Sequence, residues 1–427
     1  MRRREFLGRL ATGGAGLVVL PRWARGAAPS DTIRMGIIGV GGMGGGHVRW
    51  FLGQPDVRIV AICDVDARRR AEKLKWVHDR YRNQEAKGYG DFRRVLDRPD
   101  IDAISTATPD HWHALVTCTA FQAGKDAYSE KPLAHNYREA RAMLTMCRRY
   151  GRIFQLGTQI HAGDNYHRVV ELVRSGALGK VHTVHVWKSM GCPVIREAGP
   201  RKPPPGFDYE MWLGPAPWRP YHPGHVFFNF RFFLDYSTGF YADFWCHISD
   251  IAFWALDLGS PTTIATRGEF QTEGEADAPK WLDMDLEFPD GLRYLWRSRR
   301  PREAPGKVGG GIGCWFQGTE GSLVCDYGAR EIFLGKEVLR DLPHVPKTIP
   351  RSPGHQRNFL DSVKSRRPTE SNLPYVFRMT APMFFGRISL LLGRPLRWDA
   401  AKEEFTSDEE ATRLLGRVHR EPWTMPV

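Results

Sequence analysis

The feature that most constrains the fold is a glycine-rich turn that directly follows a short apolar stretch. Residues 33–41 (IRMGIIGVG) have the β-branched, apolar character of a buried parallel strand that enters this turn. The spacing Gly-x-Gly-x-x-Gly lets backbone N–H groups approach a pyrophosphate at the start of a helix. The pattern therefore predicts a dinucleotide site with contacts from Gly39, Gly41, Gly42, Met43 and Gly44.

An acidic residue at the expected distance supports this prediction. Residues 57–63 (VRIVAIC) form a second strand-like stretch that ends at Asp64, twenty residues after Gly44. Dinucleotide-binding units place there the carboxylate that accepts hydrogen bonds from the adenosine ribose. Because a carboxylate also repels a ribose phosphate, NAD is favoured over NADP. The arginines at 68–70 leave NADP as an alternative, since they either contact such a phosphate or form a solvated helix face.

Strand, loop and helix alternate up to about residue 155. A strand is expected over 101–107, a turn over 108–113 (TPDHWH), a helix over 114–123 and a strand over 126–129. This order predicts an α/β fold with a Rossmann-type, doubly wound parallel sheet over residues 29–155, and ligands bind such sheets at the carboxyl ends of the strands. The segment Glu130-Lys131-Pro132 follows one of those ends.

The pattern changes beyond residue 156. Alternating stretches such as 181–187 and 281–288 predict an α+β domain with an open, largely antiparallel sheet over 156–427, serving substrate binding and oligomerisation. Its C-terminal segment is a candidate to pack back on the first domain. Residues 200–223 are rich in proline and aromatic residues and are interpreted either as a site-lining loop or as a structural wrap.

An apolar helix over 239–256 carries the most informative polar residues. Asp243, His247 and Asp250 fall at i, i+4 and i+7, away from the apolar stripe of the same helix. Burying such groups without partners is costly. They are therefore either paired structurally or face a polar pocket.

The glycine loop, Thr-Pro-Asp-His-x-His, Glu-Lys-Pro and the later Asp-x-x-x-His together resemble the Gfo/Idh/MocA oxidoreductase family. Further similar stretches are QLGTQ at 155–159 and WLGPAP at 212–217. The resemblance implies NAD(P)-dependent oxidation or reduction at a secondary hydroxyl of a sugar, inositol or related polyol. A few members of the family use the cofactor transiently to cleave glycosides.

The resemblance also implies roles for individual residues. Lys131 contacts the substrate near the nicotinamide, His247 is the acid/base, and Asp243 orients the substrate or tunes that histidine. A base for the hydroxyl proton and a cation for the developing alkoxide suit this chemistry independently. Further cofactor contacts are expected from Thr108, Pro109, His111, His113, Glu130 and Lys131, and substrate contacts from Gln159, Trp212 and Asp250.

One residue departs from the family pattern. Relatives commonly have a small residue between the aspartate and the histidine, whereas this chain has Trp245 there. The indole either reshapes the pocket or points into the core. No metal is expected, because the spacing of His161, His222 and His225 with His247 matches no ligand pattern.

The first 28 residues are interpreted as a signal peptide. A basic start and an apolar stretch at 10–20 precede small residues at 26–28, and RREFL at 3–7 resembles the twin-arginine export motif. An ordinary basic N-terminus or a general secretory signal is the alternative. The apolar stretch is too short and glycine-rich for a stable membrane span. We therefore expect recognition by the twin-arginine machinery and a periplasmic or extracellular location.

Composition excludes two classes of protein. Five of the thirteen net positive charges lie in residues 1–28, and the rest are mixed with acidic residues without a basic, aromatic-lined stripe, which argues against a nucleic-acid partner. The seven scattered cysteines contain no C-x-x-C pair, so neither a disulfide framework nor a zinc knuckle is indicated.

Export bears on the reaction, because free nicotinamide cofactor is scarce outside the cytoplasm. A tightly held NAD that is regenerated in each cycle is therefore expected. A sugar oxidoreductase and a redox-neutral glycoside-cleaving enzyme both fit this expectation. A non-catalytic sugar-binding protein that retains its cofactor is a third interpretation, which Trp245 would suggest and Lys131, Asp243 and His247 oppose. A homo-oligomer is expected in each case.

Overall fold

The computed structural model describes residues 32–196, 199 and 201–426. The expected signal peptide at 1–28 lies outside the described residues. Within them, no helix has the length and apolar character needed to cross a membrane.

The first domain is built on a six-stranded parallel sheet, which confirms the predicted doubly wound Rossmann architecture. Its strand order is β3-β2-β1-β4-β5-β6, so the strand order reverses beside β1. The strands are β1 (Ile33–Ile38), β2 (Val57–Cys63), β3 (Lys87–Tyr89), β4 (Ala103–Thr106), β5 (Asp126–Ser129) and β6 (Phe154–Leu156). The helices are α2 (Gly42–Leu52), α3 (Ala67–Tyr81), α4 (Arg93–Leu96), α5 (Asp110–Gln122) and α6 (Tyr137–Tyr150).

The second domain contains a ten-stranded sheet in the order β14-β13-β12-β11-β7-β10-β9-β8-β15-β16. Only the β7/β10 pair is parallel among its described strands, so the prediction of a largely antiparallel sheet is confirmed. The strands are β7 (Val181–Lys188), β8 (Thr263–Phe270), β9 (Pro279–Glu287), β10 (Arg293–Arg297), β11 (Ile312–Gly318), β12 (Ser322–Cys325), β13 (Arg330–Leu334), β14 (Glu337–Leu339), β15 (Leu396–Asp399) and β16 (Glu404–Phe405).

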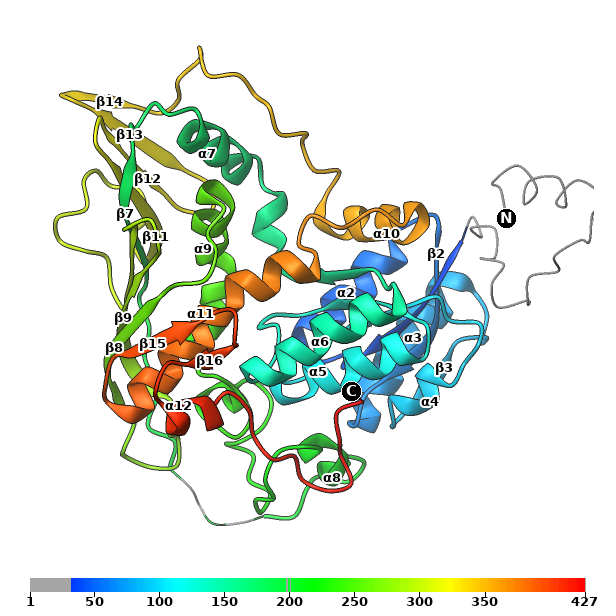
Figure 1. Cartoon of the computed structure of the whole chain (residues 1–427). Coiled ribbons are helices and arrows are strands. Elements are labelled where there is room, and N and C mark those ends of the chain that lie inside the picture. Colours follow the sequence, from blue (N-terminus) through cyan, green and yellow to red (C-terminus); the bar gives the residue numbers. More distant parts are fainter. Residues whose placement is uncertain (1–31, 197–198, 200, 427) are drawn as a thin grey trace, which may run out of the picture. The chain divides into compact units, whose positions relative to one another are not determined.

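Helices cover the face of this second sheet that is turned toward the first domain (Figure 1). α7 and α9 pack on each other, α9 packs against β7 and β11, and α11 packs against β8 and α6. The remaining elements are η1 (Gln159–Ala162), α7 (Asp164–Arg174), α8 (Tyr209–Leu213), η2 (Asn229–Phe232), α9 (Phe240–Leu256), α10 (His355–Ser365), α11 (Leu373–Leu392) and α12 (Glu409–Arg413).

The chain returns to the first domain near its C-terminal end. Phe359 and Leu360 of α10 are fully buried in the same hydrophobic cluster as β1 and β2. Arg357 and Lys364 of the same helix both form ion pairs with Asp56, at 2.8 and 2.5 Å. A boundary at residue 155 would cut through β6, so the first domain includes the end of that strand together with α10.

Helix α5 begins earlier than the sequence pattern predicts. The segment 108–113 was expected to be a turn, but the helix starts at Asp110. Pro109 precedes it in an extended conformation, with φ −61° and ψ 155°, and the Asp110 carboxylate lies in the first turn, where the helix dipole favours negative charge. Asp110, His111 and His113 are therefore fixed by a helix and not by a flexible loop.

Candidate active site

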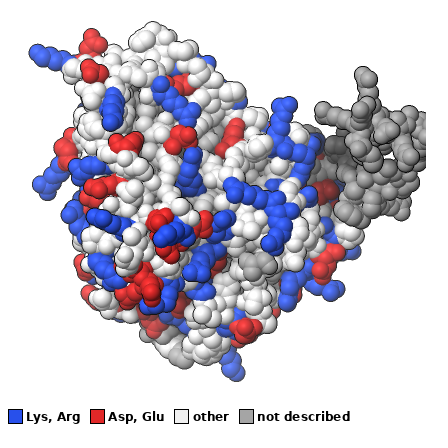
Figure 2. All heavy atoms as spheres, in the orientation of Figure 1, with Lys and Arg blue, Asp and Glu red and all other residues white. Residues whose placement is uncertain are grey.

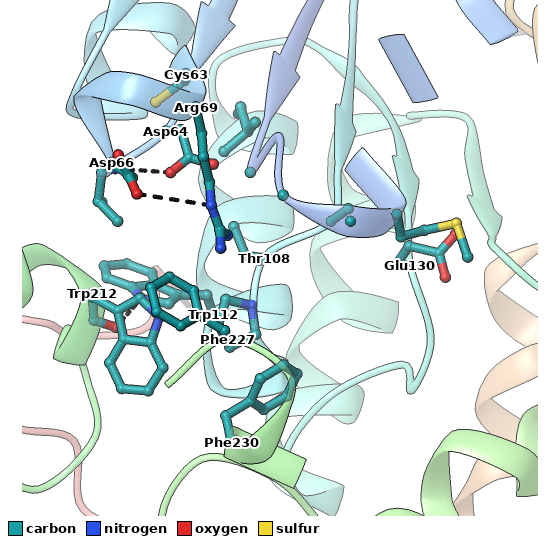
Figure 3. Close-up of a pocket in the computed structure, with 18 of the residues that line it drawn as sticks. Cys63, Asp64, Asp66, Arg69, Thr108, Trp112, Glu130, Trp212, Phe227 and Phe230 are labelled. Atoms are coloured by element: carbon teal, nitrogen blue, oxygen red, sulfur yellow. Dashed lines mark hydrogen bonds and ion pairs between the residues drawn. The ribbon is translucent and has the colours of Figure 1, made fainter. Parts of the chain in front are cut away.

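A cavity of about 400 Å³ opens at the carboxyl ends of β1, β2, β4 and β5, a size typical of small-molecule sites. One wall belongs to the first domain, with the glycine loop, Asp64, Thr108 and Glu130 (Figure 3). The other wall belongs to the second domain and is largely aromatic. It includes Phe207, Trp212, Phe227, Phe228 and Phe230.

The glycine loop has the shape that a dinucleotide requires. Gly39 has φ +73°, which favours glycine, and a Cβ there would lie 2.9 Å from the Ala107 backbone. A Cβ on Gly44 would lie 1.8 Å from the Gly39 carbonyl oxygen, so the helix start approaches the strand end closely. α2 begins at Gly42 without a side-chain cap. Its first N–H groups are therefore suited to a pyrophosphate.

Asp64 lies at the end of β2 with its carboxylate in the cavity wall. Its two oxygens accept hydrogen bonds from the backbone N–H groups of Val40 (2.7 Å) and Asp66 (2.8 Å). These bonds fix the carboxylate beside the glycine loop and leave lone pairs for ribose hydroxyls. Burial raises the pKa of Asp64. The residues present therefore fit an NAD adenosine ribose.

Arg69 extends from α3 over the same end of the cavity (Figure 3). Its guanidinium lies 4.3 Å from the Phe227 ring centroid and 3.8 Å from the Asp66 carboxylate. A Cβ on Gly41 would lie 2.9 Å from Nη1 of Arg69. Of the three arginines at 68–70, Arg69 alone lines the cavity. The sequence pattern could not distinguish these three, because the contact with Phe227 joins segments far apart in the chain.

A network of ion pairs around Asp243 lies at one end of the cavity. Nζ of Lys131 donates to Oδ1 of Asp243 at 2.9 Å, and Nε of Arg231 donates to Oδ2. Lys131 follows β5, Asp243 lies in the first turn of α9, and Arg231 lies in η2. The structure thus places two predicted residues, Lys131 and Asp243, in a direct ion pair. It adds Arg231, for which the sequence carried no motif.

The network sets the charge of its members. Burial alone would lower the pKa of Lys131, but the carboxylates of Asp243 and Glu130 outweigh burial and raise it. Burial likewise tends to raise the pKa of Asp243, and the two cations outweigh it and lower that pKa. Lys131 is therefore a fixed cation and Asp243 a fixed anion near pH 7.

His247 lies one turn after Asp243 on α9 and makes no side-chain hydrogen bond with that carboxylate among the described residues. Its Nδ1 atom is buried without a hydrogen-bond partner in the described part of the chain, and its backbone carbonyl accepts a bond from Tyr166. Burial, followed by the charge of Lys131, lowers the pKa of His247 to about 4. The imidazole is therefore neutral at pH 7, as a general base must be.

Asp110 is a second buried carboxylate at the cavity wall, and the sequence interpretation did not single it out. Its Oδ2 atom accepts a hydrogen bond from Ser237 at 2.6 Å. Burial raises its pKa, His113 opposes this, and the negative charge of Asp243 raises it further. Asp110 belongs to the Thr-Pro-Asp-His-x-His segment, in which the sequence interpretation selected only Thr108, Pro109 and the two histidines as site residues.

Those two histidines do not line the cavity. The ring nitrogens of His111 face the carbonyl oxygens of Trp212 (2.9 Å) and Tyr236 (3.3 Å). The ring nitrogens of His113 face those of Pro132 (2.6 Å) and Thr108 (2.9 Å). Both rings tie α5 to the loops around it. The structure therefore places them in supporting positions and not in contact with the cofactor cavity.

Glu130 and Gln159 form a buried cluster beside the glycine loop. Oε1 of Glu130 lies 3.1 Å from Nε2 of His47 and accepts a bond from Nε2 of Gln159 at 2.9 Å. Ser105 completes the cluster at Nδ1 of His47. Because its amide is engaged with Glu130, Gln159 supports the cofactor wall, and it is not among the residues that line the cavity.

The remaining predicted residues fall into two groups. Met43, Thr108, Pro109 and Trp212 line the cavity. Asp250 is fully buried elsewhere, bonded to His161 at 2.8 Å and to the Tyr375 hydroxyl at 2.5 Å, so its role is structural in this arrangement. Trp245 points into the core, where its Nε1 donates to the Met379 carbonyl at 2.9 Å, and it does not shape the cavity.

Comparisons with known proteins agree with this architecture. Residues 33–158 match the model of the GFO_IDH_MocA "Oxidoreductase family, NAD-binding Rossmann fold". Residues 164–425, more than half of the chain, match the model of the "Oxidoreductase family, C-terminal alpha/beta domain". The two matched segments coincide with the two sheets.

A glycosyl hydrolase family 109 protein from Shewanella pealeana is 32% identical over 154 residues, 35% of this chain and 34% of that protein. The chain thus matches about a third of the length of this curated relative. The aldose-aldose oxidoreductase of Caulobacter crescentus, solved with glycerol, has a TM-score of 0.62 at 18% identity, over 86% of this chain and 99% of that one. The WlbA dehydrogenase of Bordetella pertussis, solved with NADH and UDP-GlcNAcA, has a TM-score of 0.63 at 16% identity and the same coverage.

These solved structures share the fold, and the family models cover both domains. The cavity combines a dinucleotide-shaped glycine loop with Lys131 and Arg231, which both pair with Asp243 behind the cavity lining, one helical turn from the neutral His247. The chain belongs to the Gfo/Idh/MocA oxidoreductase family and contains the NAD-binding Rossmann domain of that family.

Proposed function

We propose that the protein oxidises or reduces a secondary hydroxyl of a sugar, inositol or related polyol and keeps its nicotinamide cofactor bound between cycles. The main support for this reaction is the Lys131–Asp243–Arg231 network, which lies next to the neutral His247. The substrate class is supported by three similar proteins: a glycosyl hydrolase family 109 protein, an aldose-aldose oxidoreductase and a dehydrogenase solved with UDP-GlcNAcA.

The chain supplies two of the functions that alcohol oxidation needs. Bound NAD provides the acceptor for the hydrogen that leaves the carbon. The Lys131 ammonium donates a hydrogen bond to the substrate oxygen and stabilises the negative charge that develops there. The His247 imidazole takes the hydroxyl proton at Nε2, since Nδ1 is buried. Asp243 and Arg231 hold the lysine in place.

Contacts between the domains support cofactor retention. The backbone N–H of Ala67 donates to the Gly206 carbonyl at 2.8 Å, and that of Asp208 donates to the Val65 carbonyl at 3.0 Å. These bonds, together with the Arg69–Phe227 contact, join second-domain loops to the loop after β2. Second-domain loops thereby cover the adenosine end of the cavity, and this cover slows release of a bound dinucleotide.

We further propose that the twin-arginine motif at 3–7 directs export of the folded, cofactor-loaded protein to the periplasm or the extracellular space. Retention of the cofactor is consistent with this route, because the protein is exported in its folded state. Fusion of residues 1–28 to a reporter tests this directly. Export that persists after both Arg3 and Arg4 are changed to lysine would contradict the twin-arginine route.

A redox-neutral glycoside-cleaving activity is the second candidate. The family 109 similarity over 154 residues favours it, because a retained cofactor serves equally for oxidation followed by elimination of an aglycone. A cofactor-retaining binding protein is less well supported, since Trp245, the feature that suggested it, packs in the core.

Product analysis without added cofactor separates these candidates. Purified protein is incubated with aldoses, inositols and nitrophenyl glycosides, and the products are identified by chromatography and mass spectrometry. An oxidised sugar formed in equal amount with a reduced one supports the oxidoreductase. Release of nitrophenol supports cleavage, and absence of turnover with NAD still bound supports the binding protein.

A further inference from the structure

A second cavity, of about 230 Å³, lies away from the NAD cavity and shares no lining residue with it. It is bounded by the start of α6, the last turns of α11 and residues 414–418 after α12. Its volume suits a small molecule and is too small for a dinucleotide. Two arginines, Arg387 and Arg417, line it.

Arg387 of α11 has an unusual position for a charged side chain. It is partly exposed, and it makes no hydrogen bond or ion pair with any residue in the described part of the chain. A guanidinium stays charged at every physiological pH. Because no nitrogen of Arg387 is among the buried atoms without a partner, its guanidinium reaches solvent at the wall of this cavity, where an anion can approach it.

Arg417 is only partly satisfied. Its Nε donates to Oε1 of Glu139 at 3.2 Å and its Nη1 to the Asp235 carbonyl at 2.8 Å. Its Nη2 atom is buried and has no partner among the described residues. Nη2 of Arg417 and the guanidinium of Arg387 are thus two donor groups without a protein acceptor in the lining of one cavity, and arginine donors of this kind bind carboxylate and phosphate.

The carboxylates near this cavity are already engaged. Oε1 of Glu139 accepts bonds from both Arg417 and His419, and the Asp235 carboxylate is paired with Arg219 at 2.6 Å. Neither carboxylate forms an ion pair with Arg387. Arg387 therefore has no carboxylate partner among the described residues.

His135 adds one complementary group. Its Nε2 donates to the Leu234 carbonyl at 2.8 Å, so Nδ1 is an acceptor, and that atom is buried without a partner in the described part of the chain. Burial lowers the pKa of His135, which keeps the ring neutral. An anion that also carries an O–H group, such as hydrogen phosphate, would satisfy both kinds of site.

We propose that this cavity binds a small oxyanion, a phosphate or carboxylate group of a metabolite, between Arg387 and Arg417. The site is separate from the NAD cavity and does not depend on the proposed reaction. A bound anion ties α11 to the segment after α12, and it therefore stabilises the C-terminal part of the chain.

The test is titration calorimetry of the full-length, NAD-saturated protein with sodium phosphate, sulfate and malonate at constant ionic strength. Saturating NAD keeps anions off the glycine loop. Arg387→Gln removes the unpartnered charge, and Arg413→Gln on α12 is the matched control, since Arg413 is 72% exposed. We expect millimolar or tighter binding that weakens at least tenfold in Arg387→Gln and is unchanged in Arg413→Gln.

The ranking of the anions identifies the ligand. Tighter binding of phosphate or sulfate indicates a phosphate group, and tighter binding of malonate indicates a carboxylate; both support the proposal. Equal binding to wild type and Arg387→Gln, or binding of none of the three, overturns it. If Arg387→Gln fails to fold, anomalous diffraction from selenate-soaked wild-type crystals replaces it, and absence of selenate between the two arginines is then the negative result. A change of oligomeric state in Arg387→Gln without anion binding would assign the cavity to a subunit interface instead.

Discussion

The two walls of the NAD cavity are built in different ways. The first-domain wall depends on backbone at its centre, where the glycines at the start of α2 lie beside the Asp64 carboxylate, which two backbone N–H groups hold in place. The second-domain wall consists of side chains from two short helices and the loop between them, such as Trp212 of α8, Arg231 of η2 and Phe227. The glycine loop and Asp64 are thus positioned by local geometry, whereas the network of Lys131, Asp243 and Arg231 depends on residues brought together by tertiary packing.

The largest effect is expected at the proposed base. His247→Gln should lower kcat by about 10²–10⁴-fold, the usual contribution of general base catalysis. NAD content after purification should stay unchanged, because His247 does not line the cofactor cavity. His182→Gln on β7, at an exposed position, is the matched control. Full activity in His247→Gln would remove this residue from the mechanism.

The pH dependence of kcat/KM tests the assignment of His247 as the base in a second way. The pKa of His247 is lowered to about 4, so the neutral base is present above that pH and is lost as pH falls through it. The acid limb of kcat/KM due to this group should therefore lie near pH 4 and not near 6.5, the ordinary histidine value. A limb near pH 6.5 that disappears in His247→Gln would contradict the lowered pKa.

The next largest effect is expected at the cation. Lys131→Met should lower kcat by about 10²–10³-fold, as loss of one donor to a developing oxyanion does. Arg231 remains to pair Asp243, so the fold should survive. Lys75→Met on α3 is a control at a 73% exposed lysine. Equal activity of Lys131→Met and Lys75→Met would assign the network a purely structural role.

On the backbone-built wall, Gly44→Ala should break the close approach of α2 to β1. Its Cβ would meet the Gly39 carbonyl oxygen at 1.8 Å, and such overpacking costs about 1–3 kcal/mol of stability. The purified protein should also lose most of its bound NAD, measured by absorbance after denaturation. Gly46→Ala, where a Cβ meets nothing closer than 3.8 Å, should retain it.

The smallest effect is expected at the roof of the cavity. Phe227→Ala removes a cation–π contact with Arg69, worth about 0.5–2 kcal/mol. The rate of NAD release, followed by fluorescence, should rise by about 2–30-fold, with kcat changed little. Trp218→Ala, at a 61% exposed aromatic residue outside the cavity, should release NAD at the wild-type rate.

The sequence predicted the backbone-built wall in most of its detail. The strand, the glycine spacing and Asp64 lie close together in the chain, so one local pattern determines their geometry. Both sheets and their character were also predictable, because strand alternation depends on local periodicity. Lys131, Asp243 and His247 came from the family resemblance and not from spacing alone.

The second-domain wall was harder to predict from the sequence. Arg231 is 100 residues from Lys131 and carries no motif, and only the folded chain brings both onto Asp243. Asp250 shares a helix face with Asp243, yet its neighbours His161 and Tyr375 come from other segments and enclose it in the core. Helical spacing predicts which residues share a face, but it does not predict what that face meets.

The return of α10 to the first sheet makes the dinucleotide domain discontinuous along the chain. A fragment that ends at residue 158 would lack Phe359 and Leu360, and would expose apolar side chains of the cluster to which they belong, such as Tyr128 of β5. The two domains are therefore expected to unfold together in one cooperative transition. Because α10 is translated after most of the second domain, we expect cofactor loading to follow the synthesis of both domains.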